Sequence, residues 1–137
     1  MENRRTFLQL AAAAIPVGLG AQASPTPPPG AKPPRELARH RLTGPLDAYD
    51  VVVIELNPGP GTGRDHRHTG PVLGYVLDGQ VRFGVDHGPE QVVPSGGTFF
   101  EPTGVVHSAF GSANANANAR VLAFMVVPTG SSGTVPA

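Results

Sequence analysis

The chain has 137 residues, enough for one domain, and its zero net charge at pH 7 gives no support for binding to nucleic acid or to an anionic membrane surface. It contains no cysteine, which excludes disulfides, thiolate metal ligands and cysteine nucleophiles. The 18 glycines, 16 prolines and low charged fraction of 15% favour an all-β domain rich in turns over a helical one.

Residues 1–23 have the three-part layout of an export signal. Arg4 and Arg5 precede a 14-residue apolar run at 7–20, and residues 21–23 form an A-x-A cleavage site. The run is shorter than the roughly 18–20 residues that span a bilayer. We therefore expect a periplasmic or secreted protein that has no membrane attachment after cleavage. The paired arginines resemble a twin-arginine signal, whose cargo crosses the membrane already folded; an ordinary export signal is the alternative.

The mature chain is expected to begin with a proline-rich linker. Residues 24–34 contain six prolines in eleven positions, which excludes a helix and favours an extended tether. The folded domain is expected over residues 35–128, and residues 129–137 are expected to form a flexible tail.

Between these ends, short apolar runs alternate with turn signals about every ten residues, which is typical of a sandwich or barrel. Asp78-Gly79 predicts a hairpin turn that pairs 72–77 with 80–85. The run SANANANA at 112–119 predicts a loose hairpin loop, because asparagine and alanine are poor strand formers. The predicted strands are 36–42, 50–57, 72–77, 80–85, 91–93, 98–101, 105–110 and 120–127.

Three histidines give the clearest functional signal in the chain. His66 and His68 are one residue apart, so in a strand both imidazoles point to the same face. His107, from a distant strand, could add a third nitrogen ligand. We interpret the three as the ligands of one divalent metal ion; imidazoles accept iron, manganese, zinc, nickel and copper, so the identity of the metal stays open.

The histidines stand in two motifs, at residues 61–79 and 96–107, that resemble those of the cupin superfamily and of its small single-domain, type-2-like members. The matching positions are Gly61, His66, His68 and Gly79 in GTGRDHRHTGPVLGYVLDG, and Gly96, Pro102, Gly104 and His107 in GGTFFEPTGVVH. The resemblance covers about residues 50–127. It implies a single antiparallel jelly-roll β-barrel with the metal inside.

The sequence departs from the cupin pattern at two positions. Val72 stands where the family has a glutamate ligand, and Gly111 stands where it has an asparagine. Three neutral imidazoles would leave the ion with its full positive charge, an arrangement similar to that of some cupin dioxygenases that bind an anionic substrate directly to iron. The alternative is that Glu101 serves as a substitute carboxylate.

These residues support a metal-dependent dioxygenase-type oxidoreductase that acts on a small anionic or chelating substrate. A non-catalytic small-ligand-binding protein is one alternative. A metal-dependent isomerase or lyase is another, and the general base that it needs could be Glu101 or Tyr75.

Two further predictions concern Arg64 and the oligomeric state. Arg64 shares strand parity with His66, so it could bind an anionic substrate if the strand extends that far; a rim position on a flexible loop is the alternative. By parity with Val72, Tyr75 is expected to face away from the metal. Cupins of this size often dimerise through the outer sheet, so a homodimer is left open.

Overall fold

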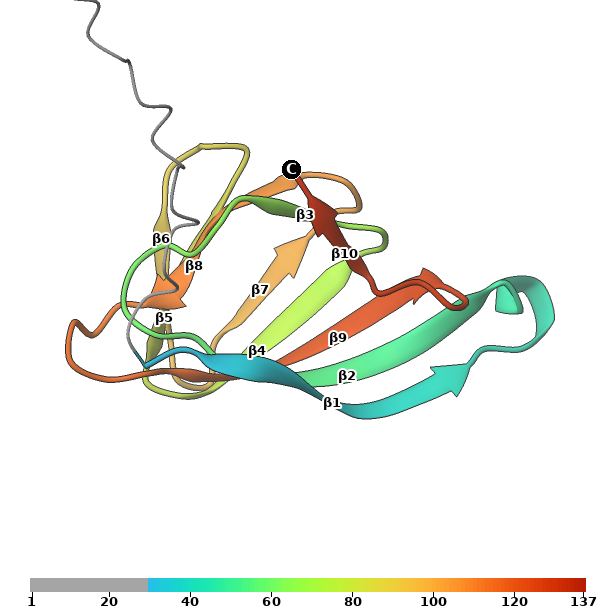
Figure 1. Ribbon diagram of the computed structural model, residues 1–137, viewed down its shortest axis with the longest axis horizontal. Coiled ribbons are helices and arrows are strands. Elements are labelled where there is room, and N and C mark those ends of the chain that lie inside the picture. Colours follow the sequence, from blue (N-terminus) through green and yellow to red (C-terminus); the bar gives the residue numbers. More distant parts are fainter. Residues whose placement is uncertain (1–29) are drawn as a thin grey trace, which may run out of the picture.

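Two five-stranded antiparallel sheets face each other in the computed structural model, which describes residues 30–137 (Figure 1). The strands are β1 (Lys32–Arg41), β2 (Tyr49–Asn57), β3 (His66–His68), β4 (Val72–Asp78), β5 (Gln80–Val85), β6 (Gln91–Pro94), β7 (Thr98–Glu101), β8 (Val106–Ser112), β9 (Arg120–Pro128) and β10 (Thr134–Pro136). One sheet has the order β1-β2-β9-β4-β7 and the other β10-β3-β8-β5-β6. The predicted all-β jelly-roll fold is confirmed.

All eight predicted strands are present, with ends shifted by up to four residues. A single 3₁₀ turn, Gly44–Leu46, lies between β1 and β2. Within the described part of the chain, no helix has the length and apolar character needed to cross a membrane. The predicted signal peptide at residues 1–23 and most of the proline-rich linker lie outside the described residues.

The turn at Asp78-Gly79 does not make the predicted hairpin. β4 pairs with β7 and β9, whereas β5 pairs with β6 and β8 in the opposite sheet. At Gly79, whose φ of 75° favours glycine, the chain crosses from one sheet to the other. The crossing brings the inward faces of β4 and β5 together, so that Val76 and Val81 share one core cluster. The loop at 112–119 likewise connects the two sheets and closes no hairpin.

The segment expected as a flexible tail contains a strand. Thr134–Pro136 forms β10, which pairs with β3 through Thr134↔His68 and Pro136↔His66. β3 has only three residues, and β8 pairs with it on its other side. β10 therefore covers what would otherwise be an exposed edge of a very short strand. At the other end of the domain, β1 begins at Lys32, inside the predicted linker.

Two apolar clusters form the core. The first lies mainly between β4, β5, β7 and β9 and comprises Val76, Val81, Phe83, Val93, Phe99, Ala119 and Val121. The second joins β2, β4 and β9 through Val52, Val72, Ala123, Met125 and Val127. Leu56 packs against both clusters. Inward and outward residues alternate along β4 and β9, as expected for strands with one buried face.

A buried ion pair at the start of β2 predicts how stability depends on pH. Asp50 is 5% exposed and accepts hydrogen bonds from Arg39 Nη1 (3.0 Å) and Thr129 Oγ1 (3.3 Å). The Arg39 hydrogen bond holds the pKa of this carboxyl below its ordinary value of 3.8. The stabilising contribution is therefore complete above pH 3.8 and is lost as the pH falls through the lowered pKa.

We expect Asp50→Asn to lose the part of the acid dependence that comes from this carboxylate. Urea unfolding at a series of pH values between about 2.5 and 6 should show a steep loss of stability at the acid end for the parent chain and a shallower one for the variant. Equal slopes for the two proteins would contradict the assignment of this carboxylate.

Candidate metal centre

The structure brings the three predicted histidines together. β3 places His66 and His68 on one face, and His107 in β8 lies directly opposite His66 in the register. The ring centroid of His66 lies 4.9 Å from each of the other two, and those two lie 6.1 Å apart. One ligand nitrogen from each ring lies within 4.8 Å of the others. This group could hold a metal ion.

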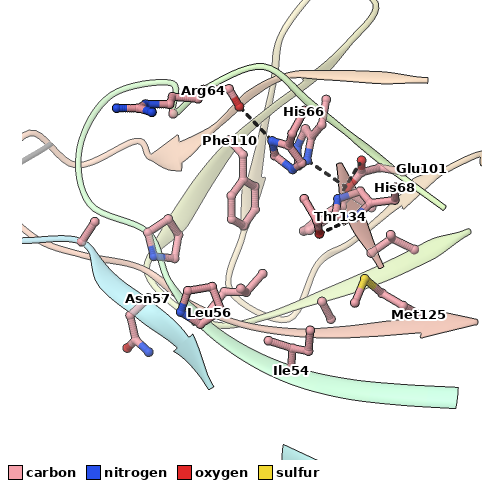
Figure 2. Close-up of a pocket in the computed structure, with 18 of the residues that line it drawn as sticks. Ile54, Leu56, Asn57, Arg64, His66, His68, Glu101, Phe110, Met125 and Thr134 are labelled. Atoms are coloured by element: carbon pink, nitrogen blue, oxygen red, sulfur yellow. Dashed lines mark hydrogen bonds and ion pairs between the residues drawn. The ribbon is translucent and has the colours of Figure 1, made fainter. Parts of the chain in front are cut away.

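Backbone carbonyls fix the orientation of two of the rings. Nδ1 of His66 donates to the carbonyl oxygen of Arg64 (2.8 Å), as Figure 2 shows. Nδ1 of His68 donates to the carbonyl oxygen of Gly133 (3.1 Å) and lies 3.2 Å from Thr134 Oγ1. A carbonyl can only accept, so Nδ1 of each ring carries a proton, and Nε2 is the nitrogen that faces the site as a ligand. This is the support that metal-binding histidines usually receive.

His107 is the most buried member of the group. It is 3% exposed, and its ring centroid lies 5.4 Å from that of Phe83 and 5.0 Å from that of Phe110. Neither ring nitrogen has a hydrogen-bond partner among residues 30–137. Burial, helped by His66 and His68, lowers the pKa of His107 to about 3, and burial also lowers the pKa of His68. Both rings are therefore uncharged near neutral pH, the form that binds metal.

Glu101 completes the polar end of the site. This β7 residue is 1% exposed; its Oε1 lies 3.1 Å from Nδ1 of His107 and its Oε2 3.7 Å from Nε2 of His68. Burial raises the pKa of this carboxyl to about 7. Oε2 has no hydrogen-bond partner within the described chain. Buried nitrogen and oxygen atoms without partners are costly, and a divalent cation would satisfy them, so the residues fit a metal ion.

Two other candidate residues, Tyr75 and Arg64, do not point toward the histidines. Tyr75 is 41% exposed on the outer face of β4, as its parity predicted, and the structure gives it no place in the site as a base. Arg64 lies on the loop before β3, because the strand begins only at His66. Its side chain points away from the histidines in Figure 2, and its carbonyl, not its guanidinium, contacts His66. Arg64 belongs to the rim of the site.

The asparagine that is missing after His107 has a steric explanation. A Cβ atom on Gly111 would lie 1.8 Å from the carbonyl oxygen of Gly61, so no side chain fits there. The loop that contains Gly61 is fixed to β8 by hydrogen bonds from the amides of Phe110 to the Thr62 carbonyl (2.8 Å) and of Ser112 to the Gly59 carbonyl (2.7 Å). Backbone fills the space that a side chain would need.

A cavity of about 670 Å³ opens beside the histidines. His66, His68 and Glu101 lie at one end, whereas Ile54, Leu56 and Phe110 lie along the wall (Figure 2). His107 and Met125 also line the cavity. Lys32 and Arg64 also line it. The volume suits a small molecule. The sequence analysis did not identify the wall residues of β2 and β9. Strand alternation could have found Ile54 and Leu56, because they point to the same side of β2 as the buried Val52.

Comparisons with known proteins agree with this geometry. A family model described as a cupin domain matches residues 52–127. A cupin-like protein from Thermotoga maritima has a similar structure, with a TM-score of 0.59 and 17% identity over 76% of this chain and 74% of that one. A protein with a double-stranded β-helix domain from Klebsiella pneumoniae gives a TM-score of 0.54 and 19% identity over 80% and 87% of the two chains.

The DMSP lyase DddQ from Ruegeria pomeroyi is a more distant neighbour. Its TM-score is 0.50 at 19% identity, and the match covers 66% of this chain but only 43% of that one. No curated protein sequence matches the chain. At these identities the structural likenesses show a shared fold and not a shared reaction.

Proposed function

This chain belongs to the cupin domain family, and from that premise we propose that it binds one divalent metal ion through His66, His68 and His107. The observation that carries the proposal is the convergence of three imidazoles, one of them buried, at one end of the cavity. Two of them are oriented by carbonyls, and the ring nitrogens of the third have no hydrogen-bond partner among the described residues.

The reaction that we propose is a dioxygenase-type oxidation of a small molecule with an anionic or chelating head. The metal, when bound, would supply Lewis acidity and oxygen activation. The cavity would orient the substrate, with the head at the histidine end and an apolar body against Ile54, Leu56 and Phe110. The positive charges of Lys32 and Arg64 favour the approach of an anion.

Glu101 supports a second candidate function. It is the single carboxyl group among the described residues that line the cavity, so it is the available general base for a metal-dependent isomerase or lyase. A protein that binds a small ligand without turnover would use the same cavity.

Anaerobic reconstitution separates these functions. Chelator-treated protein is loaded in turn with Fe²⁺, Mn²⁺, Zn²⁺, Ni²⁺ or Cu²⁺ and then offered small carboxylic acids and diketones, with and without oxygen. We expect one metal per chain and oxygen uptake that depends on iron. Turnover without oxygen uptake would instead identify the isomerase or lyase, and tight binding without turnover under every metal would identify the binding protein.

We also propose that residues 1–23 direct the folded protein out of the cytoplasm by a twin-arginine route. The paired Arg4 and Arg5 before a short apolar run support this route. Replacing both arginines by lysine should leave an uncleaved precursor in the cytoplasmic fraction. Unchanged export of that variant would favour an ordinary signal peptide.

A further inference from the structure

Val72 and Glu101 are direct cross-strand neighbours. β4 and β7 are antiparallel, and the register pairs Val72 with Glu101. Side chains of directly opposite residues leave the sheet on the same face, with Cβ atoms about 4.5–5.5 Å apart. Both residues are buried, and both line the cavity beside the histidines. The side chains of residues 72 and 101 therefore enter the cavity side by side, so a carboxylate at either position could reach the histidines.

The contacts of Glu101 point to a cation and not to a hydrogen bond. Its Oε1 lies 3.1 Å from Nδ1 of His107, yet that nitrogen makes no hydrogen bond within residues 30–137, so the approach is not along the N–H direction. Its Oε2 lies 3.7 Å from Nε2 of His68, beyond hydrogen-bond distance. Oε2 of Glu101 and Nε2 of His68 therefore face each other without a hydrogen bond, and a positive ion between them would stabilise both.

We propose that Glu101 is the fourth protein ligand of the metal, a carboxylate supplied by β7 across from Val72. This assignment rests on the proposed three-histidine metal site. It gives the ion three nitrogen ligands and one anionic oxygen, and it reduces the charge of a divalent centre from +2 to +1. A carboxylate bound to the metal is not free to act as a general base, so the assignment also favours oxidation over the isomerase or lyase reaction.

Moving the carboxylate between the two strands tests the assignment. Zn²⁺ affinity is measured by competition with a chelating dye for the parent chain, for Glu101→Val, and for the double variant Val72→Glu/Glu101→Val. We expect Glu101→Val to weaken binding by about 100-fold, the upper end of the cost of losing a supporting contact at a metal site. The double variant should recover affinity to within about tenfold of the parent, because the carboxylate then enters the same cavity from the opposite residue.

Two control variants separate the effect of the Glu101 carboxylate from effects of lost charge or lost side-chain volume. Glu90→Gln removes an exposed carboxylate that pairs with Arg82, and it should leave Zn²⁺ affinity unchanged. Glu101→Gln keeps the side-chain volume and should lose affinity as Glu101→Val does, even if the double variant fails to fold by circular dichroism.

Parent-like affinity in both Glu101 variants would overturn the ligand assignment while leaving the three-histidine site intact. A folded double variant that binds Zn²⁺ as weakly as Glu101→Val would show that a carboxylate at position 72 cannot replace the one at position 101. That result would overturn the assignment. Failure of the parent chain to bind Zn²⁺, Co²⁺, Mn²⁺ or Fe²⁺ would instead reject the proposed metal site itself.

Discussion

Replacing His107 by alanine is expected to reduce bound metal from about one ion per chain to none. His107 lies directly opposite His66 in the register and is the most deeply buried of the three histidines. Without it, His66 and His68 remain as two imidazoles on one short strand. The site then loses one of its three converging nitrogen ligands and the ring that lies next to Glu101, so we expect the ion to be held too weakly to survive dialysis.

The measurement is elemental analysis after extensive dialysis against metal-free buffer. His66→Ala should behave as His107→Ala does. His87→Ala is the matched control, because His87 is an exposed turn residue that pairs with Asp65 outside the cavity. Circular dichroism must show that each variant is folded, since the lost imidazole leaves a cavity in the core. One metal per chain in both His66→Ala and His107→Ala would show that the ligands have been wrongly assigned.

Replacing Glu101 by glutamine is expected to stabilise the metal-free protein and to reduce the further stabilisation that bound metal provides. In the metal-free chain, burial raises the pKa of the Glu101 carboxyl from 4.5 to about 7. The folded state then binds a proton that the unfolded state has released, so stability falls as the pH rises from 4.5 to 7 and stays reduced above it. This change in the pKa corresponds to at most about 3 kcal/mol of stability.

Urea unfolding at pH 8 measures both effects. With a chelator present, Glu101→Gln should exceed the parent chain in free energy of unfolding by up to about 3 kcal/mol. With excess Zn²⁺ this advantage should nearly disappear, because a 100-fold weaker affinity removes about 2.7 kcal/mol of ligand stabilisation from the variant. The opposing dependence that comes from His107 is present in both proteins and cancels in the comparison. A variant that is less stable under both conditions would indicate a structural role for Glu101 instead.

The histidine site could be predicted from the sequence because two of its residues are neighbours on one strand and the third stands in a recognisable motif. The parity of His66 and His68 requires only that residues 66–68 form a strand, and they do. The position of His107 followed from its motif. For Arg64 the parity argument was conditional on a strand that extends to residue 64, and β3 begins only at His66, so the alternative of a rim position on the loop holds.

What could not be predicted depends on which strands become neighbours. The pairing of Val72 with Glu101 requires β4 to lie beside β7, a choice made by the packing of both sheets. Asp78-Gly79 has the composition of a hairpin turn, yet burial of Val76 against Val81 decides that the chain crosses between sheets. β10 was missed for the same reason, since Thr134–Pro136 has only three residues, one of them proline, and gains its conformation from pairing with β3.

The dependence of β3 on distant partners has a consequence for the order of events in folding. Its histidines are held by β8, about forty residues later, and by the Gly133 carbonyl, 65 residues after His68. Closing loops of this length is slow compared with forming a local turn. Metal therefore has no local nucleus to bind, in contrast to small zinc modules whose ligands are close in sequence. We expect Zn²⁺ to leave the refolding rate of this barrel nearly unchanged and to act by slowing its unfolding.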